Sequence, residues 1–257
     1  MAMGFQQKEI KIISEPSRDK PFIVIYKPKG IPSAPLTPED TNNAFYQASK
    51  LYSELLNVQG RKPVEHGLLH RIDTETDGLL LIALSQDFYD YMMEEQKKGH
   101  FIKKYRAHCK KTPLNTEKLD GFCHLDQDVT SKILDNTFSL TVKSYFRNYG
   151  PGLKEVRPVT ENSGKAALKK LGKKTEYETI ISIKKIGTEY FADCTINSGY
   201  RHQVRCHLAW IGFPIIGDKL YNYEERFSEL SNQLEFTAYC FSFINPYTRK
   251  TEIFSID

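Results

Sequence analysis

One apolar run constrains the fold of this chain more than any other feature. Residues 79–84 read Leu-Leu-Leu-Ile-Ala-Leu, bounded upstream by Gly78 and downstream by Ser85 and Gln86. A short, continuous apolar run between turn-forming residues is typical of a strand that is covered on both faces. Asp73 then lies in a loop that feeds a rigid strand, and such loops often carry catalytic side chains.

Asp73 follows Arg71 in the segment His70-Arg71-Ile72-Asp73. A carboxylate close behind an arginine can be half of a local ion pair, or it can be a turn-forming aspartate. For an isolated Arg-x-Asp segment these interpretations are favoured over catalysis. Asp73 is therefore a catalytic candidate whose assignment depends on the rest of the chain.

Segments that resemble strands outnumber those that resemble helices. We expect helices over residues 42–57, with Thr41 as the cap, from Ser85 to about Lys98, ended by Gly99, and over residues 202–211. Because strands and helices do not alternate regularly, an α+β fold is favoured over a doubly wound parallel sheet. The expected strands are residues 21–26, 79–84, 102–109, 137–144, 177–185, 189–197 and 234–244.

The composition is that of an ordinary globular protein. With 257 residues the chain can bury a substantial core, in one large domain or two small ones. A net charge of +4 permits an anionic partner but does not require one. We find no Pro/Gly/Ser-rich linker, no internal repeat, and no apolar run long enough for a secretory signal or a membrane span. A cytoplasmic location is expected.

Neither a metal nor a nucleotide cofactor has support in the sequence. The five cysteines are scattered without a Cys-x-x-Cys pair or a Cys/His ligand spacing, which argues against a zinc site or a disulfide framework. Glycine-rich phosphate loops of the Walker and dinucleotide types do not occur. We expect His70, His202 and His207 to form hydrogen bonds or packing contacts rather than to bind metal.

Positive charge is concentrated between residues 143 and 174. Tyr145, Phe146 and Tyr149 are interleaved with the first part of this basic segment, a mixture suited to phosphate contact and base stacking. A solvated, flexible loop explains the same residues equally well. The basic residues are Lys143, Arg147, Lys154, Arg157, Lys165, Lys169, Lys170, Lys173 and Lys174.

A second polar cluster follows the expected strand at residues 189–197. Arg201 and Arg205 are four residues apart, so on a helix they would share a face and could present two guanidinium groups to one carboxylate or phosphate. A surface helix with solvated charges is the alternative interpretation. The opposite, packing face would consist of Val204, Leu208 and Ile211.

Together the two clusters resemble motifs of the RluA-type pseudouridine synthases. Residues 70–80 resemble the family's His-Arg-Leu-Asp-x-x-Thr-Ser-Gly-Leu-Leu motif, and residues 199–208 resemble its Gly-Arg-x-His-Gln-Ile-Arg-x-His-Leu motif. The matches run in the family's order from about residue 23 to residue 246. Four lesser similarities lie at residues 23–30, 103–107, 164–177 and 213–221.

The resemblance implies a fold and a reaction. It implies a single catalytic domain over residues 1–257, built on a mixed, mainly antiparallel sheet with flanking helices. These enzymes detach uracil from ribose within an RNA chain, rotate it and rejoin it through carbon 5, without a cofactor. Structured tRNA or ribosomal RNA is the substrate that the resemblance implies.

The resemblance also implies roles for individual residues. Asp73 would be the essential carboxylate, whether it attacks covalently or removes a sugar proton. Tyr105 would stack on the displaced uracil and take the carbon 5 proton, although a tyrosine in the core of a strand is the competing interpretation. Arg205 would pair with Asp73 and lower the pKa of its carboxyl group. The expected substrate-binding residues are Arg71, which would help to expel the target nucleotide, and Arg201, His202 and Gln203.

Three positions depart from the family's motifs. Asp77 replaces a serine, Tyr200 replaces an arginine, and Tyr26 replaces an asparagine. Asp77 adds a negative charge near Asp73, where it could either bond the turn or perturb the ionisation of that carboxylate. The segment before Pro21 is too short for a small RNA-binding domain, so we expect no separate one. The alternative function is an RNA-binding or RNA-chaperone module that keeps the fold without turnover.

Overall fold

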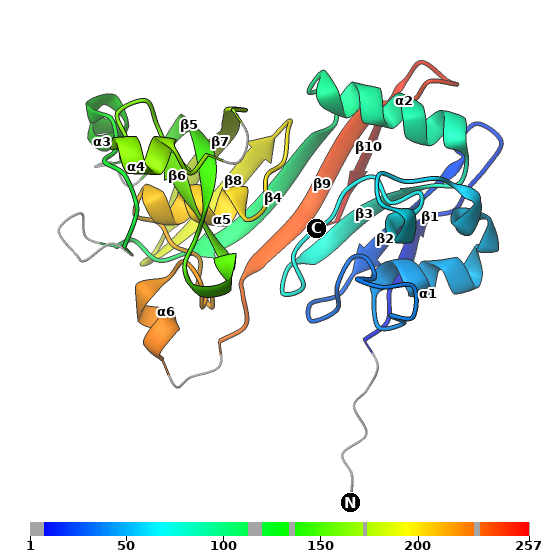
Figure 1. Cartoon of the computed structure of the whole chain (residues 1–257), viewed down its shortest axis with the longest axis horizontal. Helices are drawn as coiled ribbons and strands as arrows, with labels where there is room; N and C mark the ends of the chain where they lie inside the picture. Colours follow the sequence, from blue (N-terminus) through cyan, green and yellow to red (C-terminus); the bar gives the residue numbers. More distant parts are fainter. Residues whose placement is uncertain (1–7, 113–119, 134–136, 172–173, 229–231, 257) are drawn as a thin grey trace, which may run out of the picture. The chain divides into compact units, whose positions relative to one another are not determined.

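The computed structural model of the chain describes residues 8–112, 120–133, 137–171, 174–228 and 232–256. The chain divides into two compact units, which Figure 1 shows in the colours of the sequence. The first unit combines Met1–Lys103 with Thr237–Asp257, and the second is Lys104–Phe236. The single catalytic domain over residues 1–257 stays a prediction.

The first unit is built on strands from both ends of the chain. β1 (Lys11–Ser14), β2 (Phe22–Lys27), β3 (Asp77–Ala83) and β9 (Phe236–Ile244) lie in that order, and β10 (Thr251–Ser255) pairs with β9. β3 runs parallel to β9, whereas the β1–β2, β2–β3 and β9–β10 pairs are antiparallel. After the second unit, residues 104–236, the chain therefore returns to pair with β3, the strand that follows Asp73.

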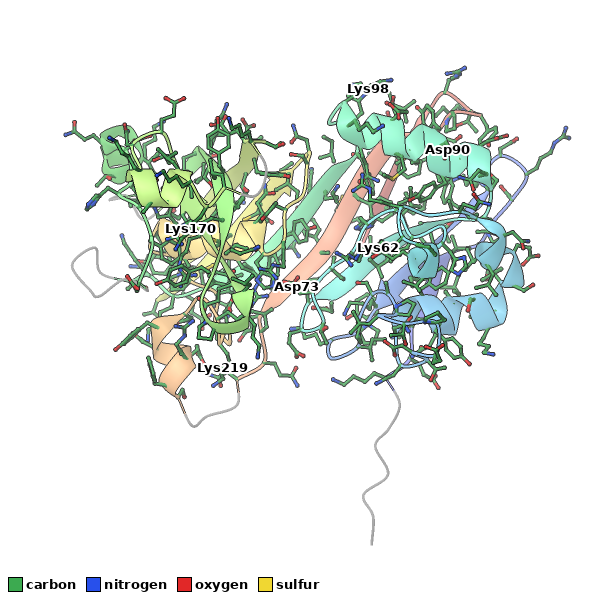
Figure 2. The ribbon with its side chains drawn as sticks, viewed as in Figure 1. Lys62, Asp73, Asp90, Lys98, Lys170 and Lys219 are labelled. Atoms are coloured by element: carbon green, nitrogen blue, oxygen red, sulfur yellow. The ribbon has the colours of Figure 1, made fainter. Side chains whose placement is uncertain are left out.

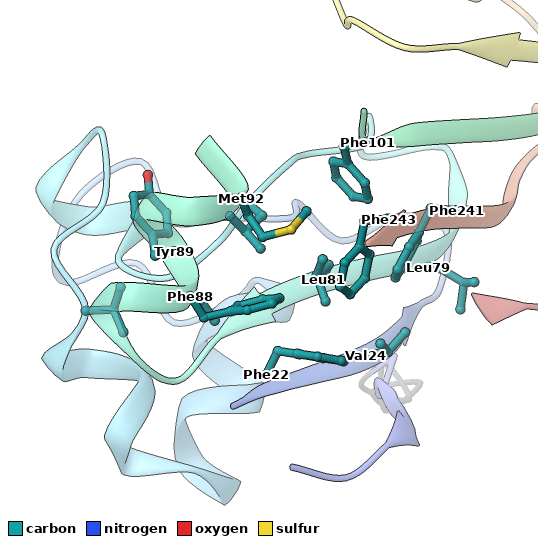
Figure 3. Close-up of a cluster of buried hydrophobic side chains, with 13 residues drawn as sticks. Phe22, Val24, Leu79, Leu81, Phe88, Tyr89, Met92, Phe101, Phe241 and Phe243 are labelled. Atoms are coloured by element: carbon teal, nitrogen blue, oxygen red, sulfur yellow. The ribbon is translucent and has the colours of Figure 1, made fainter. Parts of the chain in front are cut away.

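The expected buried strand at residues 79–84 is confirmed as β3. Its apolar run is continuous because both of its faces are covered. On one face Leu79 and Leu81 join Phe22 of β2, Phe243 of β9 and Met92 of the following helix in a buried cluster (Figure 3). On the other face, the alternate residues Leu80 and Ile82 are also fully buried. The start of β3 is thus a rigid anchor for the preceding loop.

Two helices of the first unit were expected, and one of them is shorter than the sequence indicated. α2 (Gln86–Lys97) begins after Ser85, whose side chain accepts a hydrogen bond from the Phe88 amide, as expected. The helix expected over residues 42–57 is instead α1 (Ala44–Leu51), followed by the 3₁₀ turn η1 (Ser53–Asn57). Tyr52 is extended between them, and the cap is Asn43 rather than Thr41. A second 3₁₀ turn, η2 (Pro63–Glu65), precedes the Asp73 loop.

The second unit holds strands in the order β4 (Ile102–Cys109), β8 (Glu189–Ile196), β7 (Tyr177–Ile186), β5 (Phe138–Tyr149) and β6 (Glu155–Val159). The β8–β7, β7–β5 and β5–β6 pairs are antiparallel. The strand expected over residues 137–144 continues to Tyr149 because its second half pairs with β6, which the sequence did not indicate. Pro158 has no amide hydrogen to donate, which suits β6 to the edge of the sheet.

The helices of the second unit are short. They are α3 (Gln127–Lys132), η3 (Pro151–Leu153), α4 (Lys165–Leu168), α5 (Gln203–Trp210) and α6 (Tyr223–Phe227). α5 confirms the helix expected over residues 202–211, and its Val204, Leu208 and Ile211 are buried as expected. The shared face of Arg201 and Arg205 is wrong, because His202 has φ 57 and the helix begins only at Gln203. Strands dominate both units, and the expected α+β class is confirmed.

Candidate active site

The loop that carries Asp73 is fixed by backbone hydrogen bonds on both sides of this residue. The Thr76 amide donates to the Asp73 carbonyl at 3.1 Å and closes a tight turn. Before the turn, the Ser33 hydroxyl donates to the Ile72 carbonyl at 2.7 Å and accepts from the Ile72 amide at 3.1 Å. Asp73 itself is half-buried, and Figure 2 marks it in the loop before β3. These hydrogen bonds fix the backbone from which the Asp73 side chain projects.

Lys27 ties this turn to the end of β2. Its side chain is fully buried, and its Nζ donates to the carbonyls of Pro28 at 2.9 Å, Ile31 at 2.8 Å and Thr74 at 3.1 Å. These three acceptors use all three hydrogens of an ammonium group. Burial lowers the pKa of Lys27 to about 8, although the negative charges of Asp77, Glu75 and Asp73 oppose that shift. Sequence reasoning missed this contact, for which a lysine at the end of an apolar strand is the available signal.

Asp77, which replaces the family's serine, is bonded within the first unit. Its Oδ2 accepts from the Tyr26 hydroxyl at 2.8 Å, and its Oδ1 accepts from the Thr237 hydroxyl at 3.0 Å. Lys29 Nζ lies 3.6 Å from the same Oδ1. Burial, followed by the bond and the charge of Asp77, raises the pKa of Tyr26 to about 12. The extra carboxylate is thus held by groups from β2, the following loop and β9.

His70 and Arg71, next to the turn, have different environments. His70 is half-buried, its Nε2 accepts from the Leu81 amide at 3.2 Å, and its ring makes edge-on contacts with Phe101 and Phe241. Burial lowers the pKa of His70 to about 3, so the ring is neutral at physiological pH. The side chain of Arg71 is 55% exposed and donates to Glu65 Oε1 at 2.9 Å. Its contact with the target nucleotide stays a prediction.

Tyr105 and Arg205 both belong to the second unit. Tyr105, in β4, is 8% exposed, and its ring stacks on Phe236 with 5.2 Å between the ring centroids. Arg205, in α5, makes a two-pronged ion pair with buried Asp218, in which Nε and Nη2 each lie 2.8 Å from a carboxylate oxygen. The predicted pairing of Arg205 with Asp73 stays a prediction.

Asp218 is the clearest residue that sequence reasoning missed. Its Oδ1 also accepts from the amides of Leu220 at 2.9 Å and Tyr221 at 3.1 Å, so the carboxylate is fixed before it meets Arg205. A carboxylate with these bonds holds the guanidinium of Arg205 in one orientation. The signal was present, because Asp218 belongs to the family-like segment at residues 213–221.

The other expected substrate-binding residues make extensive bonds within the second unit. Arg201 Nη2 donates to Asn148 Oδ1 at 3.0 Å and to the carbonyls of Leu153 at 2.6 Å and Glu155 at 3.2 Å. These bonds clamp the turn between β5 and β6. The roles of Arg201, His202 and Gln203 in substrate binding stay predictions.

Gln203 and His202 hold the start of α5. Gln203 is 2% exposed, and its Nε2 donates to the Glu178 carbonyl at 2.9 Å and to Thr179 Oγ1 at 3.1 Å. His202 Nδ1 lies 3.0 Å from the Tyr221 hydroxyl. The hydrogen bonding expected for His202 is therefore confirmed, and β7 is fastened to the helix.

Tyr200, the second departure from the family's motifs, packs into an aromatic stack. Its ring lies parallel to Phe146, with 5.0 Å between centroids and 5° between the planes. His207 stacks on Phe146 and hydrogen-bonds Ser144 and Thr179, which confirms a packing role for this histidine. The arginine that Tyr200 replaces has therefore been exchanged for core packing.

The basic segment at residues 143–174 is not one flexible loop. Its first part is the β5–β6 hairpin, in which Phe146 is 1% exposed and Arg157 is buried against Glu155 at 2.7 Å. These two side chains are therefore not placed to stack on bases or contact phosphates. Lys173 lies outside the described residues. The lysines that are exposed in the second part are Lys165, Lys169, Lys170 and Lys174.

The described residues offer neither a metal site nor a membrane-spanning helix. They contain no cluster of three or more His, Cys, Asp and Glu side chains that could hold a metal ion. In the same described ranges, no helix has both the length and the apolar character needed to cross a bilayer.

Comparison with known protein families decides what kind of chain this is. The family model described as RNA pseudouridylate synthase matches residues 21–210, which include the Asp73 turn, Tyr105 and α5. The chain belongs to this family. The resemblance of the two polar clusters to pseudouridine synthase motifs is confirmed, and the segments that carry the resemblance lie within or directly after the matched region.

Several curated proteins of this family are similar to the chain. An uncharacterized RNA pseudouridine synthase of Helicobacter pylori is 25% identical over 96% of this chain and 66% of its own length. Ribosomal large subunit pseudouridine synthase D of Buchnera aphidicola is 26% identical over 63% of this chain and 40% of its own length. The tRNA pseudouridine(31) synthase of Saccharomyces cerevisiae is 28% identical over 79% and 45%. The chain thus spans about two thirds or less of these relatives.

Solved structures share the fold. Human RNA Pseudouridylate Synthase Domain Containing 1 has a TM-score of 0.61 at 15% identity, covering 97% of this chain and 84% of that one. Human RNA Pseudouridylate Synthase Domain Containing 4 has a TM-score of 0.58 at 18% identity, covering 94% and 87%. The expected pseudouridine synthase-like fold is therefore confirmed.

Proposed function

We propose that this protein is an RNA pseudouridine synthase in which Asp73 is the essential carboxylate. The observation that carries the proposal is the turn itself, in a chain of this family. Ser33 and Lys27 fasten the backbone on either side of Asp73, so a half-buried carboxylate is held in one place. A catalytic group positioned in this way loses little entropy when the substrate arrives.

The chemistry needs a carboxylate beside the bond between uracil and ribose. The bond from N1 to C1′ breaks and a bond from C5 to C1′ forms. The hydrogen on C5 is released to solvent as a proton, and N1 takes up a proton, so the product is an isomer of the substrate. Asp73 would assist either by attacking the sugar covalently or by removing a sugar proton. Tyr105 would take the C5 proton, and Arg205, oriented by Asp218, would stabilise the ionised form of Asp73.

The substrate we propose is a uridine in structured tRNA or ribosomal RNA, modified in the cytoplasm. Two of the similar proteins are named for the ribosomal large subunit and for tRNA, which supports this class of substrate. The target nucleotide must leave the base stack, which costs a few kcal/mol and least in a loop. Arg71, with its exposed side chain, is the residue we propose for that step.

Phosphate contacts are assigned to the exposed lysines of the second unit. Lys165, Lys169 and Lys170 lie in and directly after α4, where their ammonium groups reach solvent. Lysines that neutralise phosphates release counterions and give RNA affinity that falls with salt. We therefore expect RNA binding to persist when the catalytic carboxylate is removed.

Tritium release tests the activity. RNA labelled at uracil C5, prepared as separate tRNA and ribosomal RNA pools, is incubated with the intact protein, with Asp73→Ala, with Asp73→Asn and with Asp90→Asn. Asp90 is an exposed carboxylate on α2 that accepts from Gln86, so its substitution controls for the loss of one negative charge.

Release by the intact protein and by Asp90→Asn, but by neither Asp73 variant, is the expected result. Equal release from all four proteins would exclude Asp73 as the catalytic group. RNA binding by every protein without release from any would favour the alternative, an RNA-binding module without turnover. Mapping pseudouridine in total RNA from cells with and without the protein would then identify the uridine.

A further inference from the structure

Two departures of this chain from its family's motifs contact each other. Tyr26 stands where the family has asparagine and Asp77 where it has serine, and the Tyr26 hydroxyl donates to Asp77 Oδ2 at 2.8 Å. The two residues lie on adjacent antiparallel strands, where Tyr26 is opposite Leu79 and Lys27 is opposite Gly78. At the end of β2 and the start of β3, the family's asparagine and serine are thus replaced by a tyrosine and an aspartate that are hydrogen-bonded to each other.

The new carboxylate is built into the strands around it. Thr237 of β9 donates to its Oδ1 at 3.0 Å, and Lys29 Nζ lies 3.6 Å from the same atom. The side chain of Asp77 is 13% exposed. A carboxylate that accepts two hydroxyl hydrogen bonds beside an ammonium group is held in one orientation and cannot swing toward Asp73. Its negative charge is consequently a fixed feature of this corner of the first unit.

The negative charge of Asp77 acts on Lys27, the neighbour of Tyr26 in β2. Asp77 is the strongest of the three negative charges that favour the ammonium form of Lys27, and Glu75 and Asp73 are the others, whereas Lys8 opposes them. Burial works against the charge and brings the pKa of Lys27 to about 8. The three carbonyls that Lys27 binds need three hydrogens, and a neutral amine has two.

We propose that Tyr26 and Asp77 act as one positioning unit that keeps Lys27 charged and thereby holds the turn that carries Asp73. The inference rests on the proposed function. Tyr26 fixes the carboxylate of Asp77, Asp77 favours the ammonium form of Lys27, and that ammonium group bonds the Thr74 carbonyl within the turn. Neither Tyr26 nor Asp77 is required to touch the RNA.

The pH dependence of turnover follows from this arrangement. Below a pH of about 8 Lys27 carries three hydrogens and all three carbonyls are bonded, whereas above it one carbonyl loses its donor. Turnover should therefore fall as the pH rises through about 8. Asp77→Asn removes the strongest charge that supports the ammonium form, so its alkaline fall in turnover should begin at a lower pH.

The test compares intact protein, Asp77→Asn, Tyr26→Phe, the double variant and Asp90→Asn. kcat and KM for tritium release are measured between pH 6 and pH 9, with Asp77→Ser as a second variant where Asp77→Asn does not fold. At the intact protein's best pH above neutrality, kcat of Asp77→Asn should fall about 10-fold to 100-fold, the range expected for slight misplacement of a catalytic group, with KM little changed. Tyr26→Phe should lower kcat less, and should lower it no further in the Asp77→Asn background.

An activity-independent measurement separates this inference from the proposed function. Amide hydrogen exchange at Ile72 and Thr76, both donors in the turn, should be faster in Asp77→Asn than in intact protein or Asp90→Asn. Faster exchange without tritium release by intact protein would refute the proposed function and leave the positioning unit standing.

The positioning unit is overturned by any of three results in an active protein. These are an unchanged alkaline fall of kcat in Asp77→Asn, unchanged exchange of the turn amides, or additive losses in the double variant.

Discussion

Acidification from pH 7 to pH 5 should destabilise this protein through two histidines. His207 of the second unit is fully buried and His70 of the first is half-buried, and desolvation lowers the pKa of each to about 3. For His70 the positive charge of Lys103 adds to the effect. His207 lies between the hydroxyls of Ser144 at 2.9 Å and Thr179 at 2.8 Å, which suit a neutral ring.

The direction and the size of this loss of stability follow from how many protons the folded and unfolded states bind. In the unfolded chain both rings take up a proton near pH 6.5, whereas in the folded chain they do so only near pH 3. Between these values the unfolded state binds more protons, so stability is present above pH 6.5 and is lost as the pH falls. Each ring contributes about 2 kcal/mol of loss between pH 7 and pH 5, and the two together contribute about 4 kcal/mol.

Urea unfolding at a series of pH values measures this loss, with fluorescence and circular dichroism as independent probes. His207→Gln removes one titrating ring, so the loss between pH 7 and pH 5 should shrink by about 2 kcal/mol, whatever the variant's stability at pH 7. Asp90→Asn should leave it unchanged. If the free energy of unfolding fell equally with pH in the intact protein and in His207→Gln, a neutral, buried His207 would be refuted.

Three further results are expected. Arg205→Ala should lower the free energy of unfolding by about 3–5 kcal/mol in urea titrations, because it leaves buried Asp218 without its two-pronged partner, and a loss below about 1 kcal/mol would contradict that pairing. Gly78→Ala should lower the free energy of unfolding by about 3 kcal/mol or prevent folding, because Gly78 has φ +132 and a Cβ would lie 2.2 Å from the Ala238 carbonyl oxygen. Gly164→Ala, where a Cβ meets open space, should be near neutral in the same assay. Substituting Lys169 and Lys170 by Gln should lower the slope of log RNA affinity against log salt by about 1.4 to 1.8, and an unchanged slope would remove both from the phosphate contacts.

The buried strand and the framework around it could be predicted from the sequence. The continuous apolar run fixed β3, and Ser85 fixed the start of α2 because its hydroxyl is a local cap. Both are decided by neighbours in the sequence. The end of β5 and the existence of β6 could not be predicted, because they depend on pairing between residues 145–149 and 155–159 that no local propensity records.

The sequence names candidate site residues, whose roles stay predictions, but it does not reveal the contacts that hold them. Asp73 was found from its place before a buried strand, and Tyr105 and Arg205 from family motifs. Lys27 bonds a residue 47 positions away, and Arg205 bonds a residue 13 positions away. Such contacts depend on how the chain folds back on itself, which local sequence does not determine. Arg201 shows the converse case, since one left-handed residue at position 202 removed it from the helix face on which it was expected.

We expect the carboxylate of Asp73 to drive uridine isomerisation. The most direct measurement is a single-turnover reaction with RNA labelled at uracil C5, in which released tritium and newly formed pseudouridine are counted in the same sample. Intact protein and Asp90→Asn should release tritium in a one-to-one ratio with pseudouridine, and Asp73→Asn should bind the RNA and yield neither. Pseudouridine formation by Asp73→Asn at the rate of the intact protein would contradict the account.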